Sequence, residues 1–407
     1  MEKEKKMKKL IALAIALLFV IPAFAMADDK VSVSGTYYLR YYDAENYSDL
    51  NDDLDDEMNY FKSRFRLATT IKPADDVKAY FRFDLQEGRW GDQFNNTIGA
   101  WQRTGGTATN FHVDYAWVEV DKEMWKVRVG WQYVGFGLGL TEFGNQAIRF
   151  TFKTPVIIDL YYAKTSEGAS ISDEGKANED EDFYALNLSY KADGFQIDGF
   201  YAMVDNSATD FEQSLFGIYG TASFGMIDFL GQLEILDGEL GTTDYVGTQL
   251  VLQGKANVTE QIMVGLQILY AEGSDDANEV VINEIAGCDL WSFRPLSYGL
   301  METWDVEPVD PFSIAPNAGM QAVQLIADFQ ATDDLLFQAA LAYAQPEEDK
   351  MTALDSAMIF NVSFTYTFAT NAKVGLHYNL MMPDMDSTYV GPDDDASALM
   401  GAFTLKF

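Results

Sequence analysis

The stretch Trp125-Lys126-Val127-Arg128-Val129-Gly130-Trp131-Gln132-Tyr133 decides the fold class of this chain. Its odd-numbered residues are apolar or aromatic, whereas its even-numbered residues are charged, polar or glycine. Because successive side chains of a β-strand point to opposite faces, this alternation predicts a strand with one apolar and one hydrophilic face. The same period of two recurs along nearly the whole chain, so we expect an all-β protein.

Eighteen runs of this kind follow one another between Val31 and the C-terminus. Most span about 9 to 12 residues, which is the length that a tilted strand needs to cross a bilayer. Short and long connections alternate along the chain, for example residues 192–193 against the 47 residues of 272–318. This organisation predicts a transmembrane antiparallel up-and-down β-barrel with short periplasmic turns and long acidic extracellular loops. Sixteen strands remain the alternative, because the run at 147–153 is short and the run at 213–224 alternates weakly.

The N-terminus has the order of segments that is typical of a secretory signal peptide. Five lysines between residues 3 and 9 precede the apolar residues 10–24 and the small-residue site Ala25-Met26-Ala27. Cleavage after Ala27 would leave residues 28–407 as a single barrel domain with 23 basic and 61 acidic residues, a net charge of −38. No later segment reaches the roughly 18 apolar residues of a spanning helix, so we expect no helical anchor after cleavage.

Composition excludes several classes of protein. A net charge of −35 repels phosphate backbones, so we expect no nucleic-acid partner. The single Cys288 excludes a disulfide framework; a free thiol and an intermolecular bond remain as its two interpretations. The pair Ser363 and His377 lacks an acid partner and an oxyanion motif, and no phosphate-binding loop is present. We therefore expect neither an enzyme nor a resident cofactor.

The inward face of the first six strands carries most of the positive charge. Fifteen of the 23 basic residues that follow the leader lie between Lys30 and Lys153. Barrels of sixteen to eighteen strands enclose an aqueous lumen, so these side chains are expected to line a pore. They either simply solvate the lumen or create a transverse field with acids opposite. The expected lining residues are Arg40, Lys62, Arg64, Arg66, Lys78, Arg82, Asp84, Lys126, Arg128, Arg149 and Lys153, with Asp198 among the acids opposite.

The long connections concentrate acidic residues. Residues 43–57 hold eight Asp and Glu and no basic residue. Such runs are usually solvated, and binding of divalent cations that bridge to lipopolysaccharide is the functional alternative. Residues 49–53 begin like a calcium-binding loop, but Leu54 replaces the required glycine and Tyr60 the closing glutamate. At most, weak binding of Ca²⁺ or Mg²⁺ is expected.

Two local motifs resemble known barrel families. The end of the chain, with Phe403, Leu405 and Phe407 on one face, resembles the closing strand of Gram-negative outer-membrane barrels. That resemblance implies an outer-membrane location and recognition of Phe407 by the barrel-assembly machinery. Residues 127–132 are also similar to the Arg-x-Gly-Arg-Gln segment of alginate-export barrels, with Trp131 in place of an arginine.

The third long connection, residues 134–146, contains Glu142-Phe143-Gly144, which resembles the Glu-Phe-Gly core of the constriction loop of general diffusion porins. The resemblance implies that this connection folds into the barrel. Its acid would then face an arginine cluster, for which the candidates are Arg40, Arg64, Arg66, Arg82 and Arg128. A glycine-rich external hairpin tip is the alternative.

The resemblance to porins extends over the whole mature chain. It implies a water-filled channel for passive diffusion of small hydrophilic solutes and ions, embedded in outer-membrane lipid and lipopolysaccharide as a homotrimer. The alternative is a non-conducting structural or surface-binding barrel that acts through its acidic loops and residues 272–318. Ion preference stays open, because acidic loops enrich cations at the mouth while the basic wall favours anions.

Overall fold

The computed structural model describes residues 30–46, 58–90, 109–138, 141–166, 180–207, 211–276, 279–281, 289–290, 318–349, 352–389 and 393–407. The expected signal peptide, Cys288 and most of the acidic run at 43–57 lie outside these ranges. Within them, no helix is long and apolar enough to cross a membrane.

The described residues form twenty strands and no α-helix. In chain order the strands are β1 (Val31–Glu45), β2 (Met58–Ala74), β3 (Val77–Arg89), β4 (Thr109–Asp121), β5 (Trp125–Phe136), β6 (Thr141–Phe152), β7 (Val156–Ser166), β8 (Glu181–Ala192), β9 (Phe195–Asn206), β10 (Phe211–Phe224), β11 (Ile227–Leu240), β12 (Thr243–Asn257), β13 (Ile262–Ala271), β14 (Glu279–Val281), β15 (Asp289–Leu290), β16 (Met320–Thr332), β17 (Leu335–Gln345), β18 (Leu354–Ala369), β19 (Ala372–Met385) and β20 (Ala396–Lys406).

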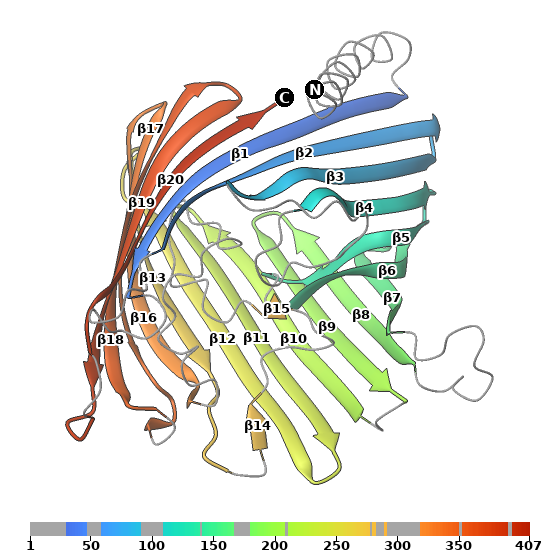
Figure 1. Ribbon diagram of the computed structural model, residues 1–407. Helices are drawn as coiled ribbons and strands as arrows, with labels where there is room; N and C mark the ends of the chain where they lie inside the picture. Colours follow the sequence, from blue (N-terminus) through green and yellow to red (C-terminus); the bar gives the residue numbers. More distant parts are fainter. Residues whose placement is uncertain are drawn as a thin grey trace, which may run out of the picture.

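Eighteen of these strands, all except the short β14 and β15, form one closed antiparallel barrel (Figure 1). Each pairs with its neighbours along the chain, β13 pairs with β16, and β1 pairs with β20 to close the ring. Closure is what a sheet in lipid requires, because an open edge would leave backbone groups without hydrogen bonds. The predicted eighteen-stranded up-and-down barrel is confirmed.

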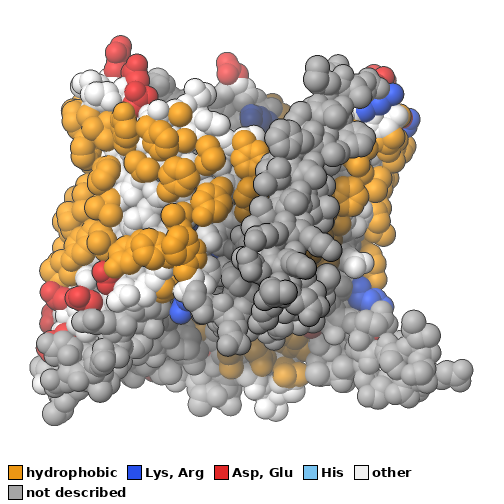
Figure 2. All heavy atoms as spheres, turned by 45° about the horizontal axis from the view of Figure 1, so that its top comes forward, with side chains coloured by type: hydrophobic (Ala, Val, Ile, Leu, Met, Phe, Trp, Pro, Cys, Tyr) orange, Lys and Arg blue, Asp and Glu red, His pale blue; other side chains and the backbone are white. Residues whose placement is uncertain are grey.

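The outward face of the barrel is apolar. Alternate residues of most strands expose large hydrophobic side chains there, among them Val118, Val129 and Ile148, which are 49%, 48% and 46% exposed. Figure 2 shows hydrophobic side chains over the middle of one face, with charged side chains near its upper and lower rims. The apolar parity that the sequence pattern assigned to lipid therefore faces outward.

Two connections differ from the loops that the sequence predicted. Residues 237–243 separate two alternating runs of the sequence, which predicts a long connection there, but the structure has only a two-residue turn between β11 and β12, with Gly241 at a φ of +67°. Glycine adopts this left-handed conformation without steric cost, so the ladder continues to Leu240 and Thr243. The expected loop at 134–146 is mostly strand, because β5 ends at Phe136 and β6 begins at Thr141.

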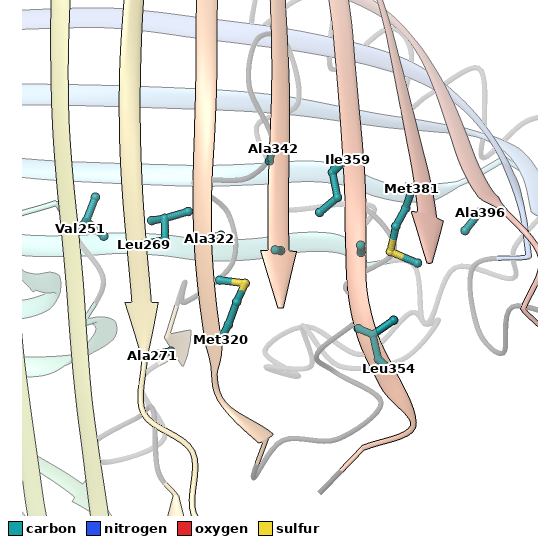
Figure 3. Packing of buried hydrophobic residues seen from close by; sticks show 12 residues of the cluster. Val251, Leu269, Ala271, Met320, Ala322, Ala342, Leu354, Ile359, Met381 and Ala396 are labelled. Carbon is teal, nitrogen blue, oxygen red and sulfur yellow. The ribbon is translucent and has the colours of Figure 1, made fainter. Parts of the chain in front are cut away.

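The inward face also differs from expectation near the ends of the strands that carry the long connections. The sequence predicts mostly hydrophilic side chains at the inward positions, but Val251, Leu269, Met320, Ile359 and Met381 form a buried apolar cluster there with several alanines (Figure 3). On β17 three alternate alanines take the inward positions between large outward residues. On β17, large outward side chains therefore alternate with small inward ones. This pattern predicts a strand, but it does not predict whether the inner face is polar.

The seam between the first and last strands ends in a tight contact. The backbone N–H of Gly35 donates to the carbonyl of Phe407 at 2.9 Å, and the Phe407 N–H donates back to the Gly35 carbonyl at 3.0 Å. A Cβ atom on Gly35 would lie 2.3 Å from Cζ of the Phe407 ring. The ring also lies 5.6 Å from that of Phe65, centroid to centroid. Gly35 therefore provides the space in which the terminal aromatic ring sits.

Candidate functional site

Strands β5 and β6 leave the barrel wall near the outer ends of their neighbours. Pairing of β4 with β5 runs only up to Ala116 opposite Trp131, and pairing of β6 with β7 begins only at Ala147 opposite Ala163. Pairing of β5 with β6 nevertheless continues up to Phe136 opposite Thr141. Residues 132–146 therefore form a hairpin, here called the inner hairpin, that has no ladder with β4 or β7 in the part of the chain that the structure describes.

Glycine and glutamine hold the bend at which the inner hairpin starts. Gly130 has a φ of +126°, and a Cβ atom there would lie 2.3 Å from the carbonyl oxygen of Ala116. Only glycine fits such a conformation at such a distance. Two residues later, the buried Gln132 donates from Nε2 to the carbonyl of Ala147 at 2.8 Å. This bond ties β5 to β6 at the base of the inner hairpin.

The inner hairpin extends into the barrel and contacts the wall formed by β7 to β11 (Figure 1). The ring of Phe136 stacks on Phe200 of β9, with centroids 5.0 Å apart and planes at 12°. Beyond it, the backbone N–H of Leu138 donates to Oε1 of Gln232 on β11 at 2.5 Å. The hairpin buries its apolar side in one cluster, whose members include Val134, Phe136, Tyr161, Phe183, Phe200, Leu215 and Leu236.

The longest connection of the chain also reaches the inner hairpin. Within residues 272–318, β14 pairs in parallel with Asp244–Val246 of β12. Further along, β15 pairs antiparallel with Thr141 and Glu142 of β6. The described parts of this connection thus lie beside strands on two different sectors of the barrel, and β15 adds to the edge of the inner hairpin.

Opposite charges alternate across the wall from β2 to β4. Arg66 forms a bidentate pair with Asp84, with both N–O distances at 2.7 Å. Its Nη2 also lies 3.1 Å from Oδ2 of Asp114, which pairs with Arg82 as well. Arg64 lies 3.9 Å from Asp84. Both carboxylates have side chains that are only 1% exposed, so their charge is largely compensated within the wall.

The same arrangement continues from β4 to β7. Glu119 accepts from Nη2 of Arg128 at 2.6 Å and lies 3.0 Å from Nζ of Lys78. The Arg128 guanidinium sits 4.0 Å from the ring centroid of Trp117, where a cation–π interaction adds to the ion pair. Arg149 forms a bidentate pair with Asp159 at 3.0 and 2.7 Å.

We call these ten charged side chains, together with Lys126, whose Nζ lies 3.8 Å from Oε2 of Glu119, the wall network. Its seven cations exceed its four carboxylates by three, so the wall keeps a net positive charge. The sequence predicts compensating acids across the lumen, such as Asp198, whereas the structure shows four carboxylates among the cations themselves, of which only Asp84 was predicted to line the pore. The members are Arg64, Arg66, Lys78, Arg82, Lys126, Arg128, Arg149, Asp84, Asp114, Glu119 and Asp159.

Three of the four acids were missed from the sequence for identifiable reasons. Asp114 sits at a bulge, where Arg82 opposes Tyr115 and Phe83 opposes Val113, so the parity of β4 changes at this residue. Glu119 and Asp159 keep a regular alternation, with Val118 and Leu160 exposed beside them. Their parity relative to these outward residues marks both acids as inward in the sequence.

Other predicted lining residues lie outside the wall network, on β1 and β2, in a short turn and in the inner hairpin. Arg40 is buried on β1 opposite Lys62, and its Nη1 donates to the hydroxyl of Tyr42 at 3.3 Å. Lys153 lies in the short turn after β6 and pairs with Asp121. Gly144 lies in the inner hairpin opposite Tyr133. The backbones of Glu142 and Phe143 belong to the same hairpin, but their side chains lie outside the described residues, so a contact of Glu142 with arginine stays a prediction.

The wall from β9 to β19 carries mainly amides and acids at its inward polar positions. Asp198 is 6% exposed and accepts from Nε2 of Gln196 at 2.8 Å. Asn379 donates to Asn361 at 2.7 Å. The inward polar residues of this sector include Asp198, Gln232, Glu234, Gln249, Gln253, Gln267, Gln324, Asp328, Gln338, Asn361 and Asn379.

Comparisons with known proteins agree with this architecture. The family profile described as Gram-negative porin matches residues 12–283. Among solved structures, OccK11 (OpdR) of Pseudomonas aeruginosa is similar with a TM-score of 0.59 at 10% identity, covering 93% of this chain and 96% of that one. OccK5 (OpdH) of the same organism gives 0.58 at 12% identity, with 93% and 99% covered. OccAB2 of Acinetobacter baumannii gives 0.58 at 12% identity, with 93% and 98% covered. Comparison with curated protein sequences gives no match.

Proposed function

Given that this chain belongs to the Gram-negative porin family and forms a diffusion channel of the outer membrane, we propose that it passes small hydrophilic solutes and ions through a constriction whose two walls differ in charge. The passage is passive and involves no chemical step. The observation that carries the proposal is the wall network, with its excess of three positive charges on one side of the lumen.

The field follows from where the charges sit. The wall network occupies β2 to β7, whereas Asp198 and Glu234 are inward on β9 and β11. A positive sector facing a sector of acids and amides orients water and dipolar solutes, and this hinders apolar molecules. Screening limits the reach of the field to about 8 Å at physiological salt, so it acts on solutes only where the lumen is narrow. The inner hairpin supplies that narrowing.

Electrical recording tests this function directly. Purified protein added to a planar bilayer should produce stepwise conductance increases, and a salt gradient should give a non-zero reversal potential because the walls are unequal. Persistent electrical silence of correctly folded barrels would contradict the proposal. That result would favour the alternative, a structural or surface-binding barrel that acts through its acidic loops.

A further inference from the structure

We propose that Gln232 is a positioning residue that fixes the tip of the inner hairpin to β11 and thereby sets the width of the constriction. The inference deepens the proposed channel function and rests on it for its electrical consequence. The placement of the hairpin itself can be measured without any current.

The side-chain amide of Gln232 is held in one orientation. Its Nε2 donates to Oε1 of Glu234 at 2.8 Å, and Gln232 and Glu234 are 1% and 0% exposed. A carboxylate accepts hydrogen bonds and does not donate them, so the NH₂ end of the amide faces Glu234. The carbonyl oxygen is thereby presented to the lumen, where it accepts from the Leu138 N–H at 2.5 Å.

The tip of the hairpin has the shape that this contact requires. Gly137 has a φ of +54°, and a Cβ atom there would lie 2.1 Å from Oε1 of Gln232 and 2.9 Å from Cβ of Tyr219. Glycine therefore lets the backbone approach both side chains closely. The neighbouring N–H of Leu138 then points at the amide oxygen. The turn after β5 and the inward side chain of β11 are thus matched in shape.

This hydrogen bond has a role that the apolar contacts cannot fill. A two-stranded hairpin is at best marginally stable alone, so the inner hairpin depends on its docking. The stack of Phe136 on Phe200 is strong but tolerates sliding, because hydrophobic contact has little directional preference. A hydrogen bond between a buried amide and a backbone N–H fixes distance and direction. Gln232 therefore determines where the tip stops.

The test compares two isosteric substitutions. Gln232→Met keeps the length of the side chain and removes the bond, whereas Gln253→Met removes a different inward bond, the 2.5 Å contact of Gln253 with Gln267 on β12 and β13. Amide hydrogen exchange of the peptide covering residues 132–146 should accelerate about tenfold in Gln232→Met, as expected from the loss of one buried hydrogen bond. The Gln253→Met variant should exchange at the wild-type rate. Equal exchange in Gln232→Met and wild type, or equal acceleration in both variants, overturns the inference.

Current recordings give the second readout. Open-channel noise should rise in Gln232→Met and stay at the wild-type level in Gln253→Met. Cysteines at positions 138 and 232, placed in a Cys288→Ser background and joined by a bifunctional thiol reagent, should restore quiet currents. A wild-type barrel that carries no current refutes the channel function, while the exchange rates still decide whether Gln232 holds the hairpin. A conducting barrel whose noise is unaffected by Gln232→Met contradicts control of the constriction.

Discussion

At Gly130 the backbone takes a φ of +126° and passes within contact distance of β4. A side chain there meets two obstacles, the strained conformation and the carbonyl of Ala116. In the sequence this glycine occupies one of the even-numbered, hydrophilic positions of the alternation. The sequence does not show that the strand bends out of the wall at this residue, because the clash that requires glycine involves Ala116 on another strand.

Replacement of this glycine is expected to be costly. Gly130→Ala forces a non-glycine residue into a sparsely populated conformation, which destabilises by about 1–3 kcal/mol before the clash with Ala116 is relieved. A lower midpoint of denaturant unfolding would show it. Gly199→Ala on β9 is the matched control, because a Cβ atom there meets no described atom within 4 Å. A Gly130→Ala barrel as stable as the control would contradict this account of the bend.

At the scale of the strands, period-two alternation predicted the barrel strands because every second residue faces outward and is apolar. Outward residues must be apolar at every height in lipid, so the signal survives even on β17, where the inward residues Ala340, Ala342 and Ala344 are also apolar. The inner hairpin could not be derived in the same way. Its strands alternate like wall strands, and their path depends on contacts with Phe200 and Gln232, which are more than sixty residues away in the chain.

The wall network gives a prediction at this scale. Replacing Arg64, Arg66 and Arg82 together by glutamine removes three of seven cations and leaves Asp84 and Asp114 without their main partners. The remaining four cations then equal the four carboxylates, so selectivity should shift toward cations. The reversal potential in a salt gradient measures the shift. Lys122→Gln in the short turn after β4, where Lys122 pairs with Asp76, is the control for simple loss of charge. An unchanged reversal potential in the triple variant would refute the placement of these arginines at the constriction.

At the scale of the whole molecule, ring closure depends on the seam of β1 and β20. The sequence predicted that the chain ends on a strand with Phe407 on its apolar face, and the structure pairs that strand with β1. The partner of the terminal ring was not predictable, because Gly35 lies at the other end of the chain and carries no side chain that could signal a contact. The space beside Gly35 is apparent only in the folded barrel, where β1 and β20 pair.

Filling that space should weaken closure. Gly35→Val places a branched side chain where a Cβ atom alone would lie 2.3 Å from the Phe407 ring, so the ring must leave its position or the strands must separate. The barrel should unfold at lower temperature in detergent, visible as loss of heat-modifiable migration on gels. Gly401→Ala on β20, where the nearest atom lies at 3.8 Å, serves as the comparison. Equal unfolding temperatures for the two variants would exclude a role of Gly35 in the seam.

The detachment of residues 132–146 from β4 and β7 bears on how the molecule matures. Wall strands find their partners through ladders in which this segment takes no part, so the cylinder can be sealed in the bilayer while still wide. Narrowing depends instead on contacts of the hairpin with β7 to β11. Closure of the ring and narrowing of its lumen therefore depend on different sets of contacts within one polypeptide.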